Sequence, residues 1–145
     1  MKYTDWIIPR LRELEQERAA LTNIPERILV LEMKFAGLKA TDTEGDRVSG
    51  GENHREEMLL ANIAERDELK RNLEITRREV EQMDAALAEL SREERLVLER
   101  FYIKRELGHV DRLCEELGCE VANVYKIKNR ALVRLARSLH GQVNL

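Results

Sequence analysis

The residues best suited to chemistry in this chain lie together in residues 118–140, GCEVANVYKIKNRALVRLARSLH. This segment has five Lys or Arg residues and a single acid, Glu120, whereas the whole chain has a formal net charge of −3. A run of cations without intervening acids favours contact with a polyanion such as nucleic acid, although a merely solvated basic face would show the same charges. The cations are Lys126, Lys128, Arg130, Arg134 and Arg137.

The spacing of apolar residues predicts that residues 121–140 form one amphipathic helix. At about 100° per residue, the apolar side chains fall on one stripe centred on Val124, and the polar ones lie opposite. The stripe consists of Val124, Ile127, Ala131 and Leu135, with Leu132 beside it. The opposite face consists of Ala122, Lys126, Asn129, Val133 and Arg137, flanked by Asn123 and Arg130.

This face has the side chains that read and hold duplex DNA. Asn amides can contact adenine, Lys126 can reach the acceptors of guanine, and Arg130, Arg134 and Arg137 can neutralise phosphates. Ala122 is small enough to let the helix enter a groove. Lys128 lies at the edge of the buried stripe, so we expect it to pair with an acid of the preceding helix. The predicted DNA-binding residues are Glu120, Ala122, Asn123, Tyr125, Lys126, Asn129, Arg130, Arg134 and Arg137.

A second short helix is predicted just before this segment. HVDRLCEELG, residues 109–118, is amphipathic, and the acids Glu115 and Glu116 are the expected partners of Lys128. Gly118 supplies the left-handed backbone that ends such a helix. Helix, glycine turn and basic helix together predict a helix-turn-helix. A further short helix is expected to begin at a capping box formed by Ser91 and Glu94.

The remaining elements predict a helical platform, residues 1–89, in front of a helix-turn-helix domain, residues 90–145. We expect helices at about 4–21 and 25–38, separated at Asn23 and Pro25, then a flexible loop over 39–52. A long helix of about 54–90 is predicted to begin at a capping box of Asn53 and Glu56. Its apolar seam needs a partner, either the first two helices or a second copy in a homodimer. The seam is Leu59, Asn62, Arg66, Leu69, Leu73, Thr76, Val80, Met83, Leu87 and Leu90, and Leu60, Ile63 and Ile75 lie outside it.

Composition predicts an all-α, intracellular protein without catalytic chemistry. The 145 residues are 43% hydrophobic and 37% charged but only 4% aromatic, which is typical of paired helices. No apolar run is long enough for a signal sequence or a membrane span, so we expect a cytoplasmic location. Cys114, Cys119 and His109 lack a fourth ligand, and no nucleophile, base and orienting group occur together. We therefore expect no metal, no cofactor and no enzyme activity.

The C-terminal part resembles a known family. The segments LSREERLVLERFYI, VDRLCEELGC and VYKIKNRALVRL resemble region four of bacterial sigma factors over residues 87–138. With NIPERI, VSGG and FYI, the whole chain resembles phage regulators of the ArpU/RinA kind, which implies activation of late or packaging genes in prophages of low-GC Gram-positive bacteria. At the positions where the family often reads the promoter with Arg or Glu, this chain has Val121, Ala122 and Tyr125.

Three functional classes follow from these observations. The first is a sequence-specific, DNA-binding transcription regulator, with RNA polymerase as a candidate second partner. The second is a DNA-packaging recognition subunit of the small-terminase type, since such subunits also join a helix-turn-helix to oligomerising helices. The third is a module that binds a polymerase subunit without contacting DNA. The sigma regions that bind core polymerase and melt DNA are absent from this sequence, so it is not expected to act as a full sigma factor.

Overall fold

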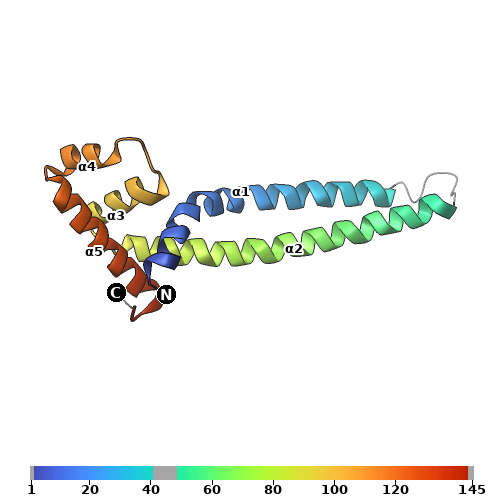
Figure 1. Cartoon of the computed structure of the whole chain (residues 1–145). Coiled ribbons are helices and arrows are strands. Elements are labelled where there is room, and N and C mark those ends of the chain that lie inside the picture. Colours follow the sequence, from blue (N-terminus) through green and yellow to red (C-terminus); the bar gives the residue numbers. More distant parts are fainter. Residues whose placement is uncertain (1, 41–48, 144–145) are drawn as a thin grey trace. The chain divides into compact units, whose positions relative to one another are not determined.

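The computed structural model describes residues 2–40 and 49–143, and every regular element in these residues is a helix (Figure 1). The all-α prediction is confirmed. In chain order the elements are α1 (Thr4–Ala40), α2 (Ser49–Ala88), α3 (Arg92–Leu98), the π-helical turn η2 (Glu99–Ile103), α4 (His109–Leu117) and α5 (Val121–His140).

The chain forms two compact units. Unit 1 consists of Met1–Arg18 and Glu79–Leu145, and unit 2 consists of Ala19–Arg78. The division differs from the boundary at residue 89 that the sequence indicated. The start of α1 and the end of α2 belong with the C-terminal helices, so both long helices contribute to both units.

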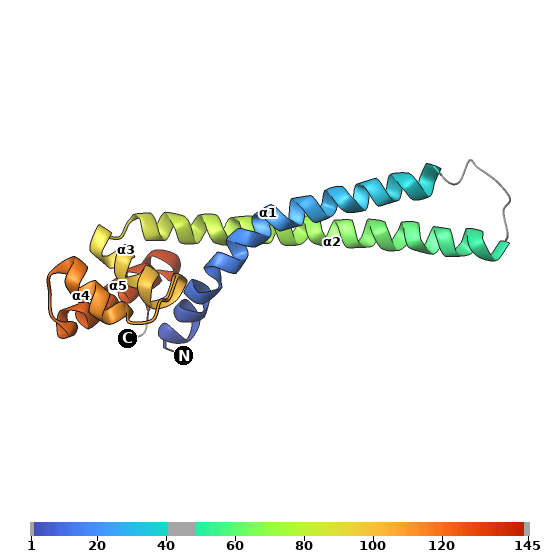
Figure 2. The ribbon, with the colours of Figure 1, turned by 90° about the horizontal axis from the view of Figure 1, so that it is seen from above.

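Unit 2 is an antiparallel pair of helices formed by the second half of α1 and the first part of α2 (Figures 1 and 2). The side-chain amide of Asn62 donates a hydrogen bond of 2.8 Å to the carbonyl oxygen of Leu31. Arg27 forms an ion pair with Glu65 at 3.3 Å. The predicted seam of α2 is therefore the face that meets α1, while Leu60 is 66% exposed, as expected for a residue outside the seam.

The predicted break at Asn23 and Pro25 is wrong, because α1 continues through it as one helix of 37 residues. A proline inside a helix removes one backbone hydrogen bond and crowds the preceding turn. Here the apolar positions continue across Pro25 at steps of three and four, so ending the helix would remove part of its packed face. These positions are Leu21, Ile24, Ile28, Leu31, Phe35 and Leu38, all at least half-buried.

The predicted start of the long helix is also wrong. α2 begins at Ser49, so Asn53 lies in its second turn and does not cap the helix. Extending an existing helix by one turn costs less free energy than nucleating a new helix, which explains why α2 includes Gly50 and Gly51. Of the predicted loop over 39–52, residues 41–48 lie outside the described residues.

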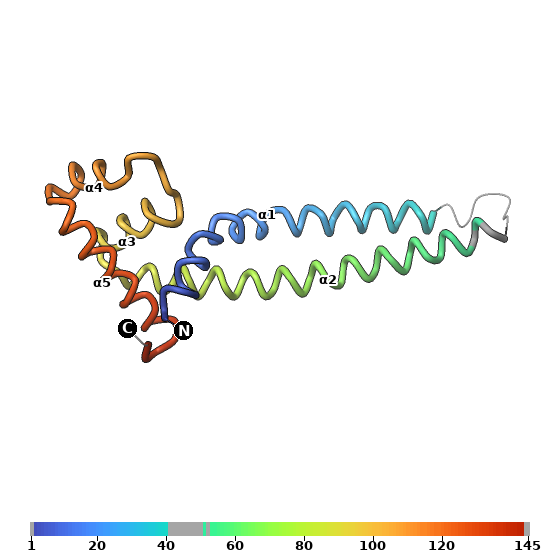
Figure 3. Tube along the Cα trace, in the orientation of Figure 1, coloured from blue at the N-terminus to red at the C-terminus, as the bar shows by residue number. Residues whose placement is uncertain are grey.

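Unit 1 is built around α5. α3 and α4 both pack against α5, and their shared core contains Val97, Phe101, Leu113 and Val124. The chain passes from α3 through η2 and a loop to α4, and then turns into α5 (Figure 3). Lys104 donates its backbone N–H to the carbonyl of Glu99 at 2.7 Å, the five-residue step of a π turn.

The first helix also contributes to unit 1. Ile7, Leu11 and Leu14 are buried, and Trp6 stacks on His140 at the end of α5 with ring centroids 3.8 Å apart. Arg18 pairs with Asp84 of α2 at 2.7 Å. The C-terminal half of α5 is thus fixed within unit 1 by packing and by a ring stack.

Candidate nucleic-acid interface

α4 and α5 are joined by a turn of three residues, 118–120. Gly118 has φ of +63°, the left-handed conformation predicted for it, and the backbone N–H of Cys119 bonds the carbonyl of Cys114 at 3.2 Å. Glu120 is extended and precedes the first turn of α5, where a negative side chain interacts favourably with the helix dipole. The left-handed Gly118 therefore ends α4, and α5 begins three residues later at Val121.

The apolar stripe predicted for α5 is buried. Val124, Ala131 and Leu135 are completely buried, Leu132 is 2% exposed, and Ile127 is half-buried. Ala136 is also completely buried, although the periodicity did not single it out. A helix whose stripe is buried in this way presents its opposite face to solvent.

All nine residues of the predicted DNA-binding set are exposed. Tyr125, the largest apolar surface among them, is 42% exposed. Lys126 and Arg137 form no ion pair with any residue of 2–40 or 49–143, so their charges face solvent unneutralised. The open face of α5 therefore combines uncompensated cations with the amides of Asn123 and Asn129.

Glu94 is a buried acid beneath this face that the sequence analysis recognised only as a helix cap. Its side chain is 1% exposed, and it forms ion pairs with Arg134 at 2.5 Å and Arg130 at 3.5 Å. It also completes the predicted capping box, since Oε1 accepts the backbone N–H of Ser91 at 3.1 Å and Ser91 Oγ accepts that of Glu94 at 3.2 Å.

The ionised form of Glu94 is favoured by these contacts. Burial raises the pKa of this carboxyl, but the hydrogen bonds with Ser91 and the charges of Arg134 and Arg130 outweigh burial and lower the pKa below its ordinary value. Glu94 is therefore a carboxylate at neutral pH.

The two arginines remain partly available. The side chain of Arg130 is 58% exposed and that of Arg134 is 51% exposed. A guanidinium has five donors in a planar fork, so a group held on one edge by a carboxylate retains donors on the other. Their predicted phosphate role is thus compatible with the ion pairs, but their charge is shared with Glu94.

The predicted partner of Lys128 is wrong. Its ammonium lies over the rings of Tyr125 at 5.1 Å and Phe101 at 5.6 Å, an arrangement that attracts cations. Glu116 instead pairs with Arg100 at 3.2 Å. Lys128 therefore contacts the aromatic rings at the edge of the buried stripe, and Glu116, one of its two expected partners, is paired with Arg100.

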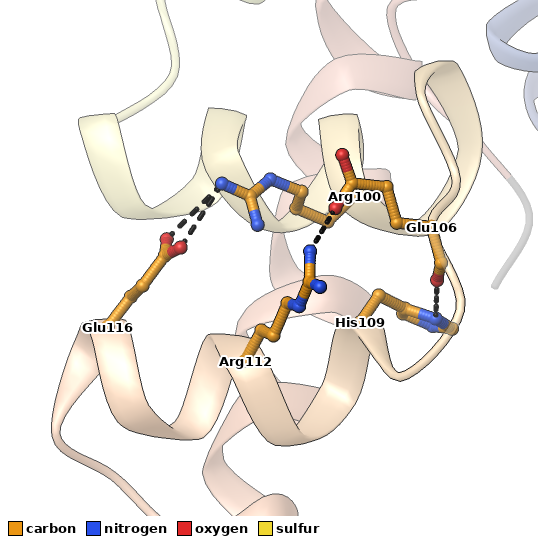
Figure 4. A network of polar contacts seen from close by, with 5 residues as sticks. All are labelled: Arg100, Glu106, His109, Arg112 and Glu116. Atoms are coloured by element: carbon orange, nitrogen blue, oxygen red, sulfur yellow. Dashed lines mark hydrogen bonds and ion pairs between the residues drawn. The ribbon is translucent and has the colours of Figure 1, made fainter.

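Polar contacts fasten α4 and the loop before it (Figure 4). Arg112 pairs with Glu106 at 2.6 Å, His109 Nδ1 is 3.1 Å from the carbonyl oxygen of Glu106, and Arg100 reaches Glu116. The side chains of Arg112 and Glu106 are more than half exposed, and Glu116 is also exposed, so each ion pair contributes about 1 kcal/mol or less. Together they hold the first helix of the pair in position.

A surface hollow adjoins the outward face near the start of α5. Asn123, Lys126 and Arg130 contribute its polar lining from α5, and Glu93 contributes the one acid. Leu117, Cys119 and Ile127 provide apolar surface at the same place. The hollow therefore joins the cationic face to the turn between the two helices.

The cysteines beside this hollow are free thiols. Burial raises the pKa of Cys114, with the neighbouring Cys119 as the next cause, which favours the protonated form. Within the described part of the chain, no group of three His, Cys, Asp or Glu side chains is arranged to hold a metal ion.

Comparisons with known proteins give no match: no family model, no curated protein and no solved structure is similar to this chain. None of the described helices is both long and apolar enough to cross a membrane. The function must therefore be argued from the geometry of α5 and its surroundings.

Proposed function

We propose that this protein is a sequence-specific, double-stranded DNA-binding transcription regulator that inserts α5 into the major groove. One observation carries the proposal: α5 buries Val124, Ala131, Leu132 and Leu135 of its apolar stripe and leaves the cationic and amide side chains of its opposite face exposed, namely Asn123, Lys126, Asn129, Arg130 and Arg137. The major groove is about 12 Å wide and admits an α-helix. A helix presented by a short glycine turn from a preceding helix is the arrangement by which such proteins enter the groove.

The side chains divide into two roles along α5. Asn123, Lys126 and Asn129 lie toward its N-terminal half, which enters most deeply, and they supply donors and acceptors for base edges. Arg137 lies further along the helix and supplies charge for a phosphate. This order assigns base selectivity to the first half of the helix and much of the sequence-independent affinity to the second.

Arg130 and Arg134 take a shared role in this proposal. Glu94 fixes one edge of each guanidinium, and the exposed edge is left to meet the DNA backbone. Fixing a long side chain before binding lowers the entropy lost on binding. The cost is that one negative charge remains close to the DNA.

The resemblance over residues 87–138 supports transcription as the process, because the similar region of sigma factors reads promoter DNA. It also supports a contact with RNA polymerase. The resemblance of the whole chain to phage regulators of the ArpU/RinA kind supports a phage or prophage origin. These parts of the proposal rest on sequence patterns, whereas the DNA-binding part rests on the exposed face of α5.

The direct experiment is to incubate the full chain with sheared genomic fragments and to sequence the fragments it retains. The proposal expects a recurring sequence motif. The control is a chain with Asn123, Lys126 and Asn129 all changed to alanine, since these side chains are exposed and their loss should not disturb the fold. Retention of the same fragments by both chains, or of no fragments by either, would refute sequence-specific binding through α5.

A further inference from the structure

The turn between α4 and α5 brings two free thiols together, those of Cys114 and Cys119. The carbonyl oxygen of Cys114 accepts the backbone N–H of Gly118 and also that of Cys119, the second at 3.2 Å. Where a helix ends in a left-handed residue, as α4 does at Gly118, the two side chains on either side of this second bond commonly contact each other. The thiols therefore lie on the same side of the turn.

The same hydrogen bond limits the distance between the Cα atoms of the two cysteines. Each bonded atom lies within about 2.5 Å of its own Cα, so a bond of 3.2 Å leaves the two Cα atoms at most about 7 Å apart. Disulfides join cysteines whose Cα atoms are about 4.4–6.8 Å apart. Both side chains also pack against one group of core residues, Val97, Phe101, Leu113 and Val124. The fold thus holds the thiols at a separation that a disulfide can span.

Cys119 is the thiol that a reagent in solution can reach. It is half-buried and lines the surface hollow beside the start of α5, together with Lys126 and Arg130. Glu93 also lines this hollow, but the two cations outweigh it. A net positive hollow attracts small anions, and glutathione disulfide is an anionic reagent of this kind.

We propose that Cys119 and Cys114 are a reversible redox pair, which a small anionic disulfide oxidises to a disulfide across the turn. In the first step Cys119 loses its proton and attacks one sulfur of the reagent, whose own S–S bond breaks and releases one thiol. In the second step Cys114 loses its proton, attacks Sγ of Cys119 and displaces the other thiol. The protein loses two electrons and two protons, and the two released thiols carry them.

The order of these steps follows from the surroundings of the two thiols. The thiolate is the form that attacks. Burial raises the pKa of Cys114, with the neighbouring Cys119 as the next cause, so little of this thiol is ionised at neutral pH. Cys119 therefore reacts with the reagent first, and the closing step at Cys114 becomes faster as the pH rises.

The test is to equilibrate the full chain with mixtures of reduced and oxidised glutathione, to quench with acid and to measure the mass. The disulfide lowers the mass by two hydrogens, and the same chain in concentrated urea gives the unfolded reference. We expect the equilibrium constant for the disulfide to be about tenfold or more larger in the folded chain, because the turn holds the thiols in place. An equal or smaller constant in the folded chain, or a bridge between two chains, would overturn the inference.

Cys114→Ser and Cys119→Ser are the matched variants, since each replaces one sulfur by oxygen and neither can close the bridge. We expect Cys114→Ser to accumulate the mixed disulfide with glutathione, and Cys119→Ser to react with glutathione disulfide more slowly. Faster reaction of Cys119→Ser would also overturn the inference, because Cys119 would then not be the thiol that meets the reagent. The redox pair is independent of the proposed function, since none of these measurements involves DNA.

Discussion

Among single residues, Glu94 has more roles than its position in the sequence indicates. It is the third residue of α3, where its Oε1 completes a cap with Ser91 and also pairs with Arg134 of α5. Its other oxygen, Oε2, faces Arg130 of α5. Arg134 lies 40 positions further along the chain. One buried carboxylate therefore fixes the start of α3 and two side chains on the proposed DNA-binding helix.

Glu94→Gln should lower the free energy of unfolding by about 1–2 kcal/mol at neutral pH, because the charge-assisted bonds to the arginines are lost. The loss stays moderate, because glutamine keeps the cap and the arginines are partly solvated. The folded-state pKa of Glu94 is lower than its ordinary value near 4.5. Its contribution is thus complete above that value and is lost as the pH falls through the lower folded pKa.

The measurement is urea unfolding of wild type and Glu94→Gln at a series of pH values. The difference in the free energy of unfolding should be largest at neutral pH and should shrink in acid, where Glu94 also becomes neutral. Glu93→Gln is the control, since Glu93 is exposed, and it should show little difference at any pH. A Glu94→Gln difference independent of pH would contradict the assigned ion pairs.

Lys126 and Arg137 should differ in what they contribute to DNA binding. Lys126→Ala should cost about 1–3 kcal/mol on the best sequence and relax selectivity, because Lys126 is assigned to a base edge. Arg137→Ala should weaken binding to all sequences alike. Competition binding with specific and random duplexes distinguishes the two, and equal uniform losses would remove Lys126 from base reading.

Helical periodicity predicted most of the buried and exposed residues of α5, because that division depends mainly on the repeat of one helix. It missed Ala136, which is completely buried, and it placed the half-buried Val133 on the open face. It was not sufficient for the partners of Glu94 and Lys128. Those contacts join α5 to α3 and η2, and which side chains meet across helices depends on their packing. The local sequence around Glu94 or Lys128 does not indicate which side chain of another helix will contact it.

Among the helices, α4 and α5 were predicted well and α1 was not. Gly118 has positive φ, so the glycine that was predicted to end the helix over 109–118 does so for a backbone reason. Pro25 and Asn53 carry only local preferences, and long packed helices override these. Gly118 was therefore a reliable helix end, whereas Pro25 and the capping pattern at Asn53 were not, and Gly50 and Gly51 of the predicted loop lie inside α2.

Gly118→Ala should destabilise the protein by about 1–2 kcal/mol, because a side chain is unfavourable in the left-handed conformation at φ of +63°. A Cβ at Gly118 would meet no atom within 4 Å, so backbone strain is the whole cause. Gly51→Ala is the matched control, since Gly51 is helical and its Cβ would also meet nothing. Thermal unfolding should show a loss for Gly118→Ala only, and equal behaviour of the two would contradict the turn geometry.

Pro25→Ala should raise the stability of the protein by about 1–2 kcal/mol, because it restores a helical hydrogen bond in the interior of α1, partly offset by a more flexible unfolded chain. Thr22→Ala, an exposed change in the same helix that restores no bond, should gain about 0.5 kcal/mol or less. Denaturant unfolding measures both. An unchanged or lower stability of Pro25→Ala would indicate that α1 is interrupted at this point.

For the whole molecule, the sequence predicted the fold class and a helical platform joined to a C-terminal domain, but it placed the boundary elsewhere. Local patterns show where helices lie, whereas the units are defined by contacts between distant residues. Arg18 and Asp84, 66 positions apart, are in one unit. The charge is unevenly distributed, since residues 1–90 have 14 Lys or Arg and 20 Asp or Glu, whereas residues 91–145 have 11 and 8.

That excess of cations in the C-terminal part makes salt dependence the most direct test of the central claim, that the open face of α5 binds duplex DNA. The measurement is the affinity of the full chain for a duplex over a range of salt concentrations. The logarithm of the association constant should fall linearly with the logarithm of salt, by roughly 0.9 per phosphate contact, and Arg137→Ala should reduce the slope by about one contact. An affinity that does not change with salt, or a slope that Arg137→Ala leaves unaltered, would contradict the claim.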